Sequence, residues 1–469
     1  MRGYILLLVL LTGCNLAPRY HQPCMEMPES WRTETNDCST AANMRWWQQF
    51  GDPILDDLIV AALQNNKDLQ VAAWRVCEFY AQFEVARSPL FPQISGQAEG
   101  IKQKLPTGTL FFPPEIDPIT PQYTFAFNLD YEIDFWGKIR NQSKAACAEL
   151  LASVENRRTV VLGLVGAVAE AYILLRQLDQ ELQIAYQTLE DRAEALEIAR
   201  DRFEGGLTSE IQVTQAASVY EETQAVITLI IQGIAEKENL LSLLIGENPT
   251  AICRGRTLNQ FEMPVQIPAG LPSDLLCRRP DILQAENLLI AANAQIGAAR
   301  AAFFPEISIT GLYGAGSFDL KKLFSTASRV WQIGADVFQN IFTGGRLTGD
   351  LHIANAQKME ALYSYEQTVL NAFREVDDAL VVQKQSRERI VIEERRVADI
   401  QQYLSLSWLR YYNGQADYLT VLDAQRELFR AQIDLTQAQG ALFVSVVELY
   451  KALGGGWVLD ADCCISQDS

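Results

Sequence analysis

Histidine is almost absent from this chain of 469 residues, which contains only His21 and His352. Histidine is the usual general base near neutral pH and a frequent metal ligand, so chemistry that depends on it has almost no material here. The sequence also contains no P-loop, nucleophile-elbow or zinc-protease motif. We therefore expect that the protein is not an enzyme and holds neither a metal nor a cofactor.

Basic residues are also scarce, with 39 Lys and Arg against 58 Asp and Glu, which gives a formal charge of −19. Nucleic-acid binding needs clustered positive charge against the phosphates, so we expect no nucleic-acid partner. An acidic conduit or a solvated acidic surface fits this balance better.

The N-terminus lacks an apolar run long enough for a permanent transmembrane helix, because its run extends only over residues 4–11. Residues 11–14 read Leu-Thr-Gly-Cys and resemble a bacterial lipobox. In that interpretation residues 1–13 are a signal peptide and Cys14 becomes the lipidated first residue. The alternative is an ordinary signal peptide with an incidental cysteine. Asn15 follows instead of the retention signal Asp, which favours an outer-membrane location with an acyl anchor in the lipid.

The nine cysteines show no CxxC spacing. In an oxidising compartment, Cys24 with Cys38, or the adjacent Cys463 and Cys464, can form disulfides, but the sequence does not decide the pairing. Apart from Cys14, the remaining four are expected to be small buried residues: Cys77, Cys147, Cys253 and Cys277.

Proline is absent from residues 122–248 and 306–469, and both tracts are rich in helix-forming residues. Residues 138–204 as one helix would reach about 100 Å at 1.5 Å per residue. Glycines then end the long helices, which predicts sharp hairpin tips at 205–209 and 413–417. Ser209 and Asp417 are predicted to cap the helices that follow.

The sequence contains an internal repeat. Residues 86–95, which contain FPQIS, return 213 positions later at 299–308 as FPEIS, and the glycine tip at 202–206 returns 208 positions later at 410–414. We therefore predict two tandem copies of one architecture. The expected organisation is a signal peptide, a lipidated tether, two repeats and a tail: 1–13, 14–50, 51–255, 256–455 and 456–469.

Residues 123–135, YTFAFNLDYEIDF, alternate between apolar and polar side chains, which is typical of a β-strand with one apolar face. Thirteen residues make about 44 Å at about 3.4 Å per residue, enough to cross an outer membrane when tilted. A half-buried strand on a soluble core is the rival interpretation. Four strands are predicted in all, at 91–103, 122–135, 304–315 and 330–341.

Four strands cannot stand alone in lipid, because their edges would be unpaired. The smallest closed barrels have about eight strands, so several copies of the chain must combine theirs. Two copies would supply eight strands and three would supply twelve. The polar face would then line a water-filled pore, where Asp130, Glu132 and Asp134 would favour cations.

Several segments resemble the outer-membrane factors of RND-type drug pumps, the TolC-like and NodT-type efflux lipoproteins. They are LLCRRPDI (275–282), AANAQIGAAR (291–300), FPEIS (304–308), the WW…FGDP start (46–55) and IFTGGR (341–346). The resemblance extends over essentially the whole mature chain. It implies a mixed, mainly α-helical membrane protein: a homotrimer whose twelve-stranded outer-membrane barrel continues into a helical periplasmic barrel.

The resemblance also implies partners and sites. The partners are a periplasmic adaptor (membrane fusion protein) and an inner-membrane RND transporter. Acidic residues narrow the periplasmic aperture in that family; one position matches Asp423 and the other falls on Thr420. Asp423 would therefore carry the gate, and stabilisation of the first turns of a helix through its dipole is the alternative explanation. The tips are expected to receive the adaptor, although plain helix capping explains the same residues: Gly206, Leu207, Gly414 and Gln415.

The function expected from these observations is passive export of small molecules through an outer-membrane channel that opens when adaptor and transporter dock. Two alternatives remain. One is a type I secretion conduit for unfolded protein, and the other is a coiled-coil lipoprotein without a pore. The exported substrate, the particular partner proteins and the resting state of the channel, open or closed, are not readable from the sequence.

Overall fold

The computed structural model of the chain describes residues 15–28, 31, 45–104, 119–262 and 272–455, without the Asp274 side chain. These residues form two compact units. The strand unit consists of Met1–Cys24, Arg75–Val154 and Gln284–Glu366, and the hairpin unit of Met25–Trp74, Glu155–Leu283 and Gln367–Ser469.

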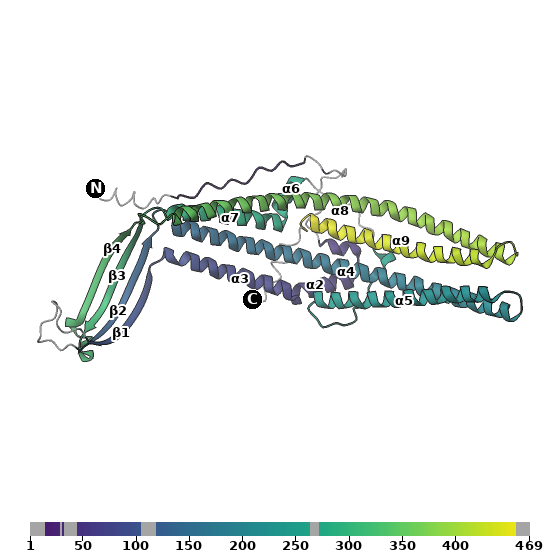
Figure 1. Cartoon of the computed structure of the whole chain (residues 1–469), viewed down its shortest axis with the longest axis horizontal. Helices are drawn as coiled ribbons and strands as arrows, with labels where there is room; N and C mark the ends of the chain where they lie inside the picture. Colours follow the sequence, from purple (N-terminus) through teal and green to yellow (C-terminus); the bar gives the residue numbers. More distant parts are fainter. Residues whose placement is uncertain (1–14, 29–30, 32–44, 105–118, 263–271, 456–469) are drawn as a thin grey trace. The chain divides into compact units, whose positions relative to one another are not determined.

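The strand unit contains one antiparallel sheet in the order β1-β2-β3-β4, whose strands lie side by side in Figure 1. The strands are β1 (Gln93–Lys104), β2 (Ile119–Ile133), β3 (Glu306–Ser317) and β4 (Arg329–Phe338). They begin and end within about three residues of the predicted bounds. Strands β1 and β4 each have one neighbour, so each leaves an open edge among the described residues.

The helices begin with α2 (Pro53–Asn65) and α3 (Lys67–Arg87), which follow a 3₁₀ turn, η1 (Trp46–Phe50). The helices α6 (Pro272–Arg278) and α7 (Pro280–Ala301) precede β3. The long helices are α4 (Lys138–Glu204), α5 (Glu210–Leu244), α8 (Arg346–Tyr412) and α9 (Tyr418–Ala452). Helices α3, α4, α7 and α8 contribute residues to both units.

The two helical hairpins, α4–α5 and α8–α9, have matching lengths. Helices α4 and α8 have 67 residues each, and α5 and α9 have 35 each. Each start and end differs by 208 positions between the hairpins, as 138 to 346 and 204 to 412 illustrate. Figure 1 shows α5 returning alongside the last part of α4.

Glycine ends each long helix through backbone geometry. Gly206 and Gly414 have φ values of 71° and 69°, in the left-handed region that glycine adopts without strain. The N–H of Leu207 donates to the carbonyl of Arg202 at 2.8 Å, which closes a Schellman motif. The predicted caps are correct in position, because Ser209 and Asp417 precede α5 and α9, but their side chains donate or accept no cap hydrogen bond.

Aromatic side chains form part of the core of the hairpin unit. Trp46 is 1 % exposed and stacks on Tyr450 with ring centroids 5.1 Å apart. Phe50 lies 5.9 Å from Phe443 and 6.1 Å from Phe261. These contacts join η1 to α9, so η1 is part of the packed hairpin unit.

Helix α4 contains an 18-residue window apolar enough to cross a membrane by composition, but 61 % of that window is buried within the chain. Such burial is typical of a core helix. The cysteines differ from expectation: Cys77, Cys253 and Cys277 are exposed in the single chain, and Cys147 is half-buried. Cys38, Cys463 and Cys464 lie outside the described residues.

Candidate functional site

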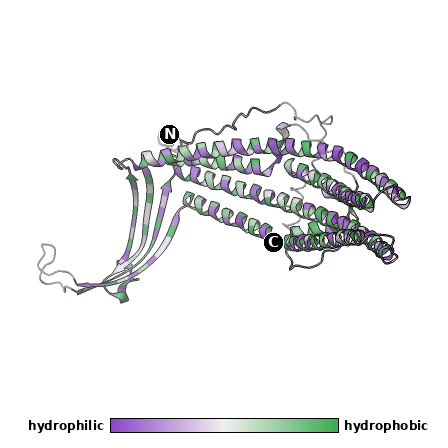
Figure 2. Cartoon of the chain, turned by 45° about the vertical axis from the view of Figure 1, so that its right-hand side comes forward, coloured by the Kyte–Doolittle hydropathy of each residue, from purple (hydrophilic) through white to green (hydrophobic). Residues whose placement is uncertain are grey.

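The sheet has one apolar and one polar face, and the pairing register shows which residues share each. Directly opposite residues point to the same side, as in the row Gly96, Phe127, Tyr313 and Trp331. All four belong to the apolar face, which includes the odd positions of β2 predicted to be apolar. Figure 2 shows hydrophobic and hydrophilic residues alternating along the strands.

The polar face contains the acidic residues of the sheet. Asp130 lies opposite Thr310, and Glu132 lies opposite Ser308, which in turn pairs with Asp336. Asp130 is exposed. Glu132 is within 3.4 Å of the Lys138 ammonium, which also contacts Glu306 at 2.6 Å.

Asp134 was predicted to lie on the strand, but β2 ends one residue earlier, at Ile133. Its carboxylate accepts hydrogen bonds from the backbone N–H groups of Ile139 and Arg140 at 3.1 and 2.9 Å. It also forms an ion pair with Arg140 at 3.1 Å. A carboxylate at the start of a helix satisfies free N–H groups there, so Asp134 anchors the beginning of α4.

The start of α9, which contains Asp423, is held by apolar packing of its neighbours. Tyr418, Val421 and Leu422 are buried in a cluster with Leu196 and Val219 of the first hairpin. Burial, followed by the nearby phenols of Tyr411 and Tyr412, raises the pKa of Tyr418 to about 12. Asp423 is exposed and Thr420 is half-buried, both in the first two turns of α9.

The hairpin tips are exposed. At the first tip Gly206 and Leu207 face solvent, and Leu207 is 73 % exposed. Gly414 and Gln415 are exposed at the second tip. The first tip therefore presents an apolar side chain where the second presents an amide.

Residues 15–22, here called the strap, contact α7 and the start of α4. Asn15 accepts a hydrogen bond from the Asn141 side chain at 3.0 Å, and the Pro18 carbonyl accepts one from Asn293 at 2.9 Å. A Cβ on Gly297 would lie 2.6 Å from the Ala17 Cβ, so only glycine permits this approach. Cys14, the predicted lipidation site, immediately precedes the strap and lies outside the described residues.

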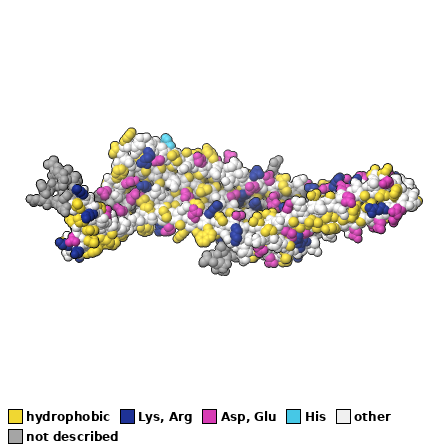
Figure 3. Space-filling view, turned by 60° about the horizontal axis from the view of Figure 1, so that its bottom comes forward, with side chains coloured by type: hydrophobic (Ala, Val, Ile, Leu, Met, Phe, Trp, Pro, Cys, Tyr) yellow, Lys and Arg dark blue, Asp and Glu magenta, His cyan; other side chains and the backbone are white. Residues whose placement is uncertain are grey.

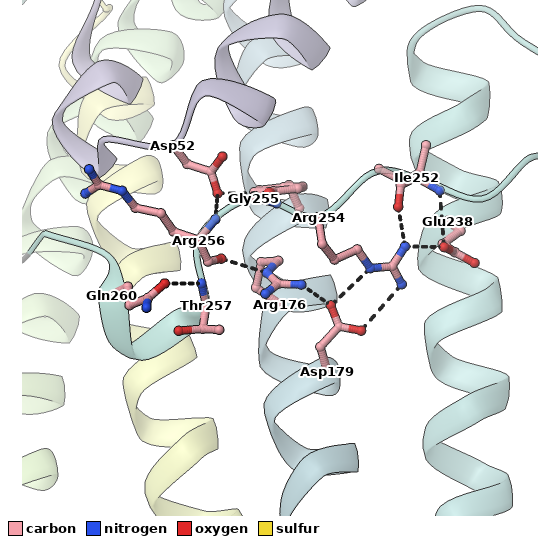
Figure 4. A network of polar contacts seen from close by, with 11 residues as sticks. Asp52, Arg176, Asp179, Glu238, Ile252, Arg254, Gly255, Arg256, Thr257 and Gln260 are labelled. Atoms are coloured by element: carbon pink, nitrogen blue, oxygen red, sulfur yellow. Dashed lines mark hydrogen bonds and ion pairs between the residues drawn. The ribbon is translucent and has the colours of Figure 1, made fainter.

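A polar network in the hairpin unit was not predicted from the sequence (Figure 4). Asp52 is 1 % exposed and accepts hydrogen bonds from the Ile54 N–H, the Tyr172 hydroxyl and the Arg256 N–H, each at 2.9 Å. Arg176 donates to the Arg256 carbonyl at 2.9 Å. The network holds the segment after α5 against α4 and the start of α2.

The same network continues through a second arginine. The Arg254 side chain contacts Asp179 at 3.2 Å and also pairs with Glu238, so it links α4 to α5. Its partners are 75 and 16 positions away. Such distant pairs leave no local signal in a sequence.

The RRPDI segment has a structural role. Arg279 is 7 % exposed and donates to the Ala452 carbonyl at 3.0 Å, at the end of α9. It also pairs with Asp281 at 2.6 Å and with Glu375 at 2.7 Å. This buried arginine therefore ties the start of α7 to α8 and α9. Within the described residues no group of three His, Cys, Asp or Glu side chains could hold a metal ion.

A sheet with an apolar face and two open edges, together with long helical hairpins, is the combination expected of one class of protein, the outer-membrane channels. The outer membrane efflux protein family matches residues 58–247 and 271–455, which is most of the chain. The chain belongs to this family.

Known outer-membrane proteins are similar to this chain over nearly their whole length. The solvent efflux pump outer membrane protein SrpC of Pseudomonas putida is 39 % identical over 458 residues, 96 % of this chain and 97 % of SrpC. The cation efflux system protein CusC of Escherichia coli O157:H7 is 35 % identical over 452 residues, 95 % of this chain and 96 % of CusC. The crystal structure of the Campylobacter jejuni CmeC outer membrane channel superposes with a TM-score of 0.91 at 25 % identity, covering 97 % of this chain and 98 % of that one.

The protein is thus an efflux channel of the outer membrane, the first of the three functions that the sequence suggested. The description of this family, outer membrane efflux protein, favours that function over a protein-secretion conduit and over a coiled coil without a pore.

Proposed function

We propose that three copies of this chain form one passive conduit, which carries small molecules out of the periplasm. One observation supports this most: the sheet has an apolar face and two open edges, at β1 and β4. Hydrocarbon does not tolerate unpaired strand edges, so the edges of neighbouring copies must pair. Three copies would contribute twelve strands, in line with the family resemblance.

The repeated helix bounds and the two family matches support an origin of the chain as two tandem copies. In the assembly the helical hairpins would continue the strand barrel as a periplasmic tunnel. The polar face of the sheet would line the pore, with Asp130 and Glu132 on it. Asp134 would contribute little to the pore, because its carboxylate is engaged at the start of α4.

We infer that Cys14 carries an acyl anchor. The strap that follows it is held in the strand unit by hydrogen bonds from Asn141 and Asn293, so an acyl chain on the preceding residue would be tethered to that unit. The anchor and the sheet would then engage the same bilayer.

Asp423 is proposed as the residue that narrows the inner end of the conduit. Asp423 is exposed and directly follows the buried Leu422 in α9, so the apolar cluster supports the turn of the helix that carries it. Three such carboxylates around one axis would attract cations and oppose anions. Thr420 lies one turn earlier and would complete the constriction without charge.

The hairpin tips are proposed to receive a periplasmic adaptor, which would connect the conduit to an inner-membrane transporter of the RND type. Leu207 supports this, because a leucine that is 73 % exposed at a tip is suited to burial against a partner. The named relatives export solvents or cations, so the class proposed for the substrate is small molecules.

The experiment that tests this function is planar-bilayer conductance of the purified lipoprotein beside Asp423→Ala. We expect a heat-modifiable trimer with a small cation-selective conductance that rises several-fold in the variant. Asp399→Ala, which removes an exposed carboxylate from α8, is the matched control and should conduct as the unchanged protein does. Equal conductance of all three proteins would remove Asp423 as the gate, and a folded trimer that never conducts would contradict the conduit.

A further inference from the structure

The charges of the sheet are sorted by face. Its acidic residues all lie on the polar face: Glu99, Asp130, Glu132, Glu306 and Asp336. Its basic residues all lie on the apolar face: Lys102, Lys104 and Arg329. A solvated surface would mix the two signs, so a sorting this complete calls for a separate explanation.

All three basic residues lie at the same end of the sheet, away from the helices. Lys104 ends β1 and Arg329 begins β4. From Ile94 to Lys102 on β1, and from Val337 to Arg329 on β4, the apolar face extends eight residues before the first charge. Eight residues make about 27 Å along a strand, or about 21 Å across the membrane at a tilt of about 40°, which is near the height of the apolar band of outer-membrane barrels.

These three side chains are exposed and form no ion pair with any residue that the structure describes. Two further exposed cations, Lys321 and Lys322, lie in the turn that leads into β4. Figure 3 shows Lys and Arg side chains beside hydrophobic ones at the sheet end of the chain. In a protein of formal charge −19, these five cations outnumber the one carboxylate of the described turn between β3 and β4, which is the exposed Asp319.

We propose that Lys102, Lys104 and Arg329 bind the phosphate groups of glycolipid in the outer leaflet of the outer membrane. Long basic side chains above an apolar band extend toward the headgroups and pair with phosphate, and arginine can do so through two hydrogen bonds. This inference rests on the proposed barrel: β1 and β4 are its open edges, so pairing between copies would bring Lys102 and Lys104 of one copy toward Arg329 of the next.

A lipid fits this surface better than a soluble polyanion. Arg329 shares its face with Trp331, which is 73 % exposed, and Lys102 shares its face with Tyr123. Phe324, beside the turn with Lys321 and Lys322, is 75 % exposed. Aromatic rings below a row of cations match the boundary between acyl chains and headgroups.

The test measures binding of fluorescent lipid A by the detergent-purified trimer, with bisphosphorylated and dephosphorylated lipid A compared. We expect the phosphorylated form to bind at least about tenfold more tightly. The triple variant Lys102→Gln, Lys104→Gln, Arg329→Gln should lose this preference. The matched control, Arg75→Gln, Lys144→Gln, Lys358→Gln, makes the same charge change on helices of the strand unit and should keep it.

Three outcomes would overturn the proposal: no preference for phosphate, an equal loss in the control, or full competition by inorganic phosphate at low millimolar concentration. The exchange Lys102→Arg, Lys104→Arg, Arg329→Lys preserves charge and should preserve binding. Conductance of the same preparations separates the two proposals. A conducting trimer without phosphate preference rejects only the lipid site, whereas a monomer that does not conduct rejects the barrel itself.

Discussion

Asp52 shows how one buried carboxylate can hold several segments together. Its oxygens accept three hydrogen bonds, from within its own turn, from α4 and from the segment after α5. A Cβ on Gly255 would lie 2.1 Å from an Asp52 oxygen, so the neighbouring backbone is shaped to the carboxylate. Burial is the main cause that raises the pKa of the Tyr172 hydroxyl well above its usual range.

We predict that Asp52→Ala lowers the free energy of unfolding by about 3 kcal/mol, because it leaves buried donors without an acceptor. Asp52→Asn should lower the free energy of unfolding by less, since the amide oxygen of Asn can replace one of the two carboxylate acceptors. The measurement is thermal unfolding in detergent followed by circular dichroism. Asp57→Ala, at an exposed position of α2, is the control and should change little; an equal loss there would contradict the assignment.

Glu181 provides a pH-dependent prediction. It is 5 % exposed, and burial raises its pKa above the ordinary glutamate value, although hydrogen bonds from Gln177 and Gln437 act in the opposite direction. The native state therefore holds this proton more tightly than the unfolded state. Stability from this site is present below the ordinary glutamate pKa and is lost as pH rises through the raised one.

Glu181→Gln should consequently raise the apparent melting temperature by about 2–4 °C at pH 7. The gain should vanish near pH 3, where glutamate is protonated in both states. Melting curves of the variant and of Glu190→Gln, an exposed control, at the two pH values provide the check. A gain of equal size at both pH values would show that the effect is not electrostatic.

For single residues, the sequence predicted the features that depend on neighbouring positions, such as the face of the sheet on which a side chain lies. Alternation assigned Asp130 and Glu132 to the polar face, but it also extended the strand to Asp134, because a period of two does not show where the ladder of hydrogen bonds stops. The partners of Asp52 lie 120 and 204 positions away, and nothing near Asp52 indicates them.

At the scale of elements, glycine determines the hairpins. Gly246 and Gly454 repeat, after α5 and α9, the left-handed geometry of the tip glycines. These stop signals were readable because a glycine at a helix end acts through its own backbone. The expected side-chain caps at Ser209 and Asp417 did not form, so position alone did not predict the hydrogen bond.

The strap is an element whose docking can be tested through Gly297. Gly297→Leu would place a side chain where Ala17 lies, and the strap would have to leave α7. We predict that trypsin then cleaves after Arg19 at least about tenfold faster, because proteolysis follows local opening. Gly349→Leu is the control, since a Cβ there meets nothing within 4 Å. Equal cleavage in both variants would mean that the strap is not held by this contact.

At the scale of the whole molecule, the number of strands and their two faces followed from the sequence, because both depend on period and on repetition. The separation of acidic and basic residues between the two faces could not be predicted from the sequence. Lys102 and Arg329 are more than 200 positions apart, and only the register through β2 and β3 shows that they share a face.

Because the acidic residues of the sheet all lie on its polar face, we expect that face to determine ion selectivity. Of the acidic residues on the polar face, Glu132 and Glu306 share the Lys138 ammonium, while Glu99, Asp130 and Asp336 have no ion pair with any residue that the structure describes. If this face lines the pore, the three unpaired carboxylates in each copy favour cations by Coulomb attraction. We predict that Glu99→Gln, Asp130→Asn, Asp336→Asn shifts the reversal potential in a KCl gradient toward zero.

The opposite face supplies the control for this measurement. The variant Lys102→Gln, Lys104→Gln, Arg329→Gln removes as many charges from the same sheet, but from its apolar face, and should leave the reversal potential unchanged. Screening distinguishes the two effects further, because the contribution of the carboxylates should fall as salt rises and the Debye length shortens. A shift caused by the apolar-face variant, with none from the polar-face variant, would mean that the faces are assigned the wrong way round and that the pore lies on the other side of the sheet.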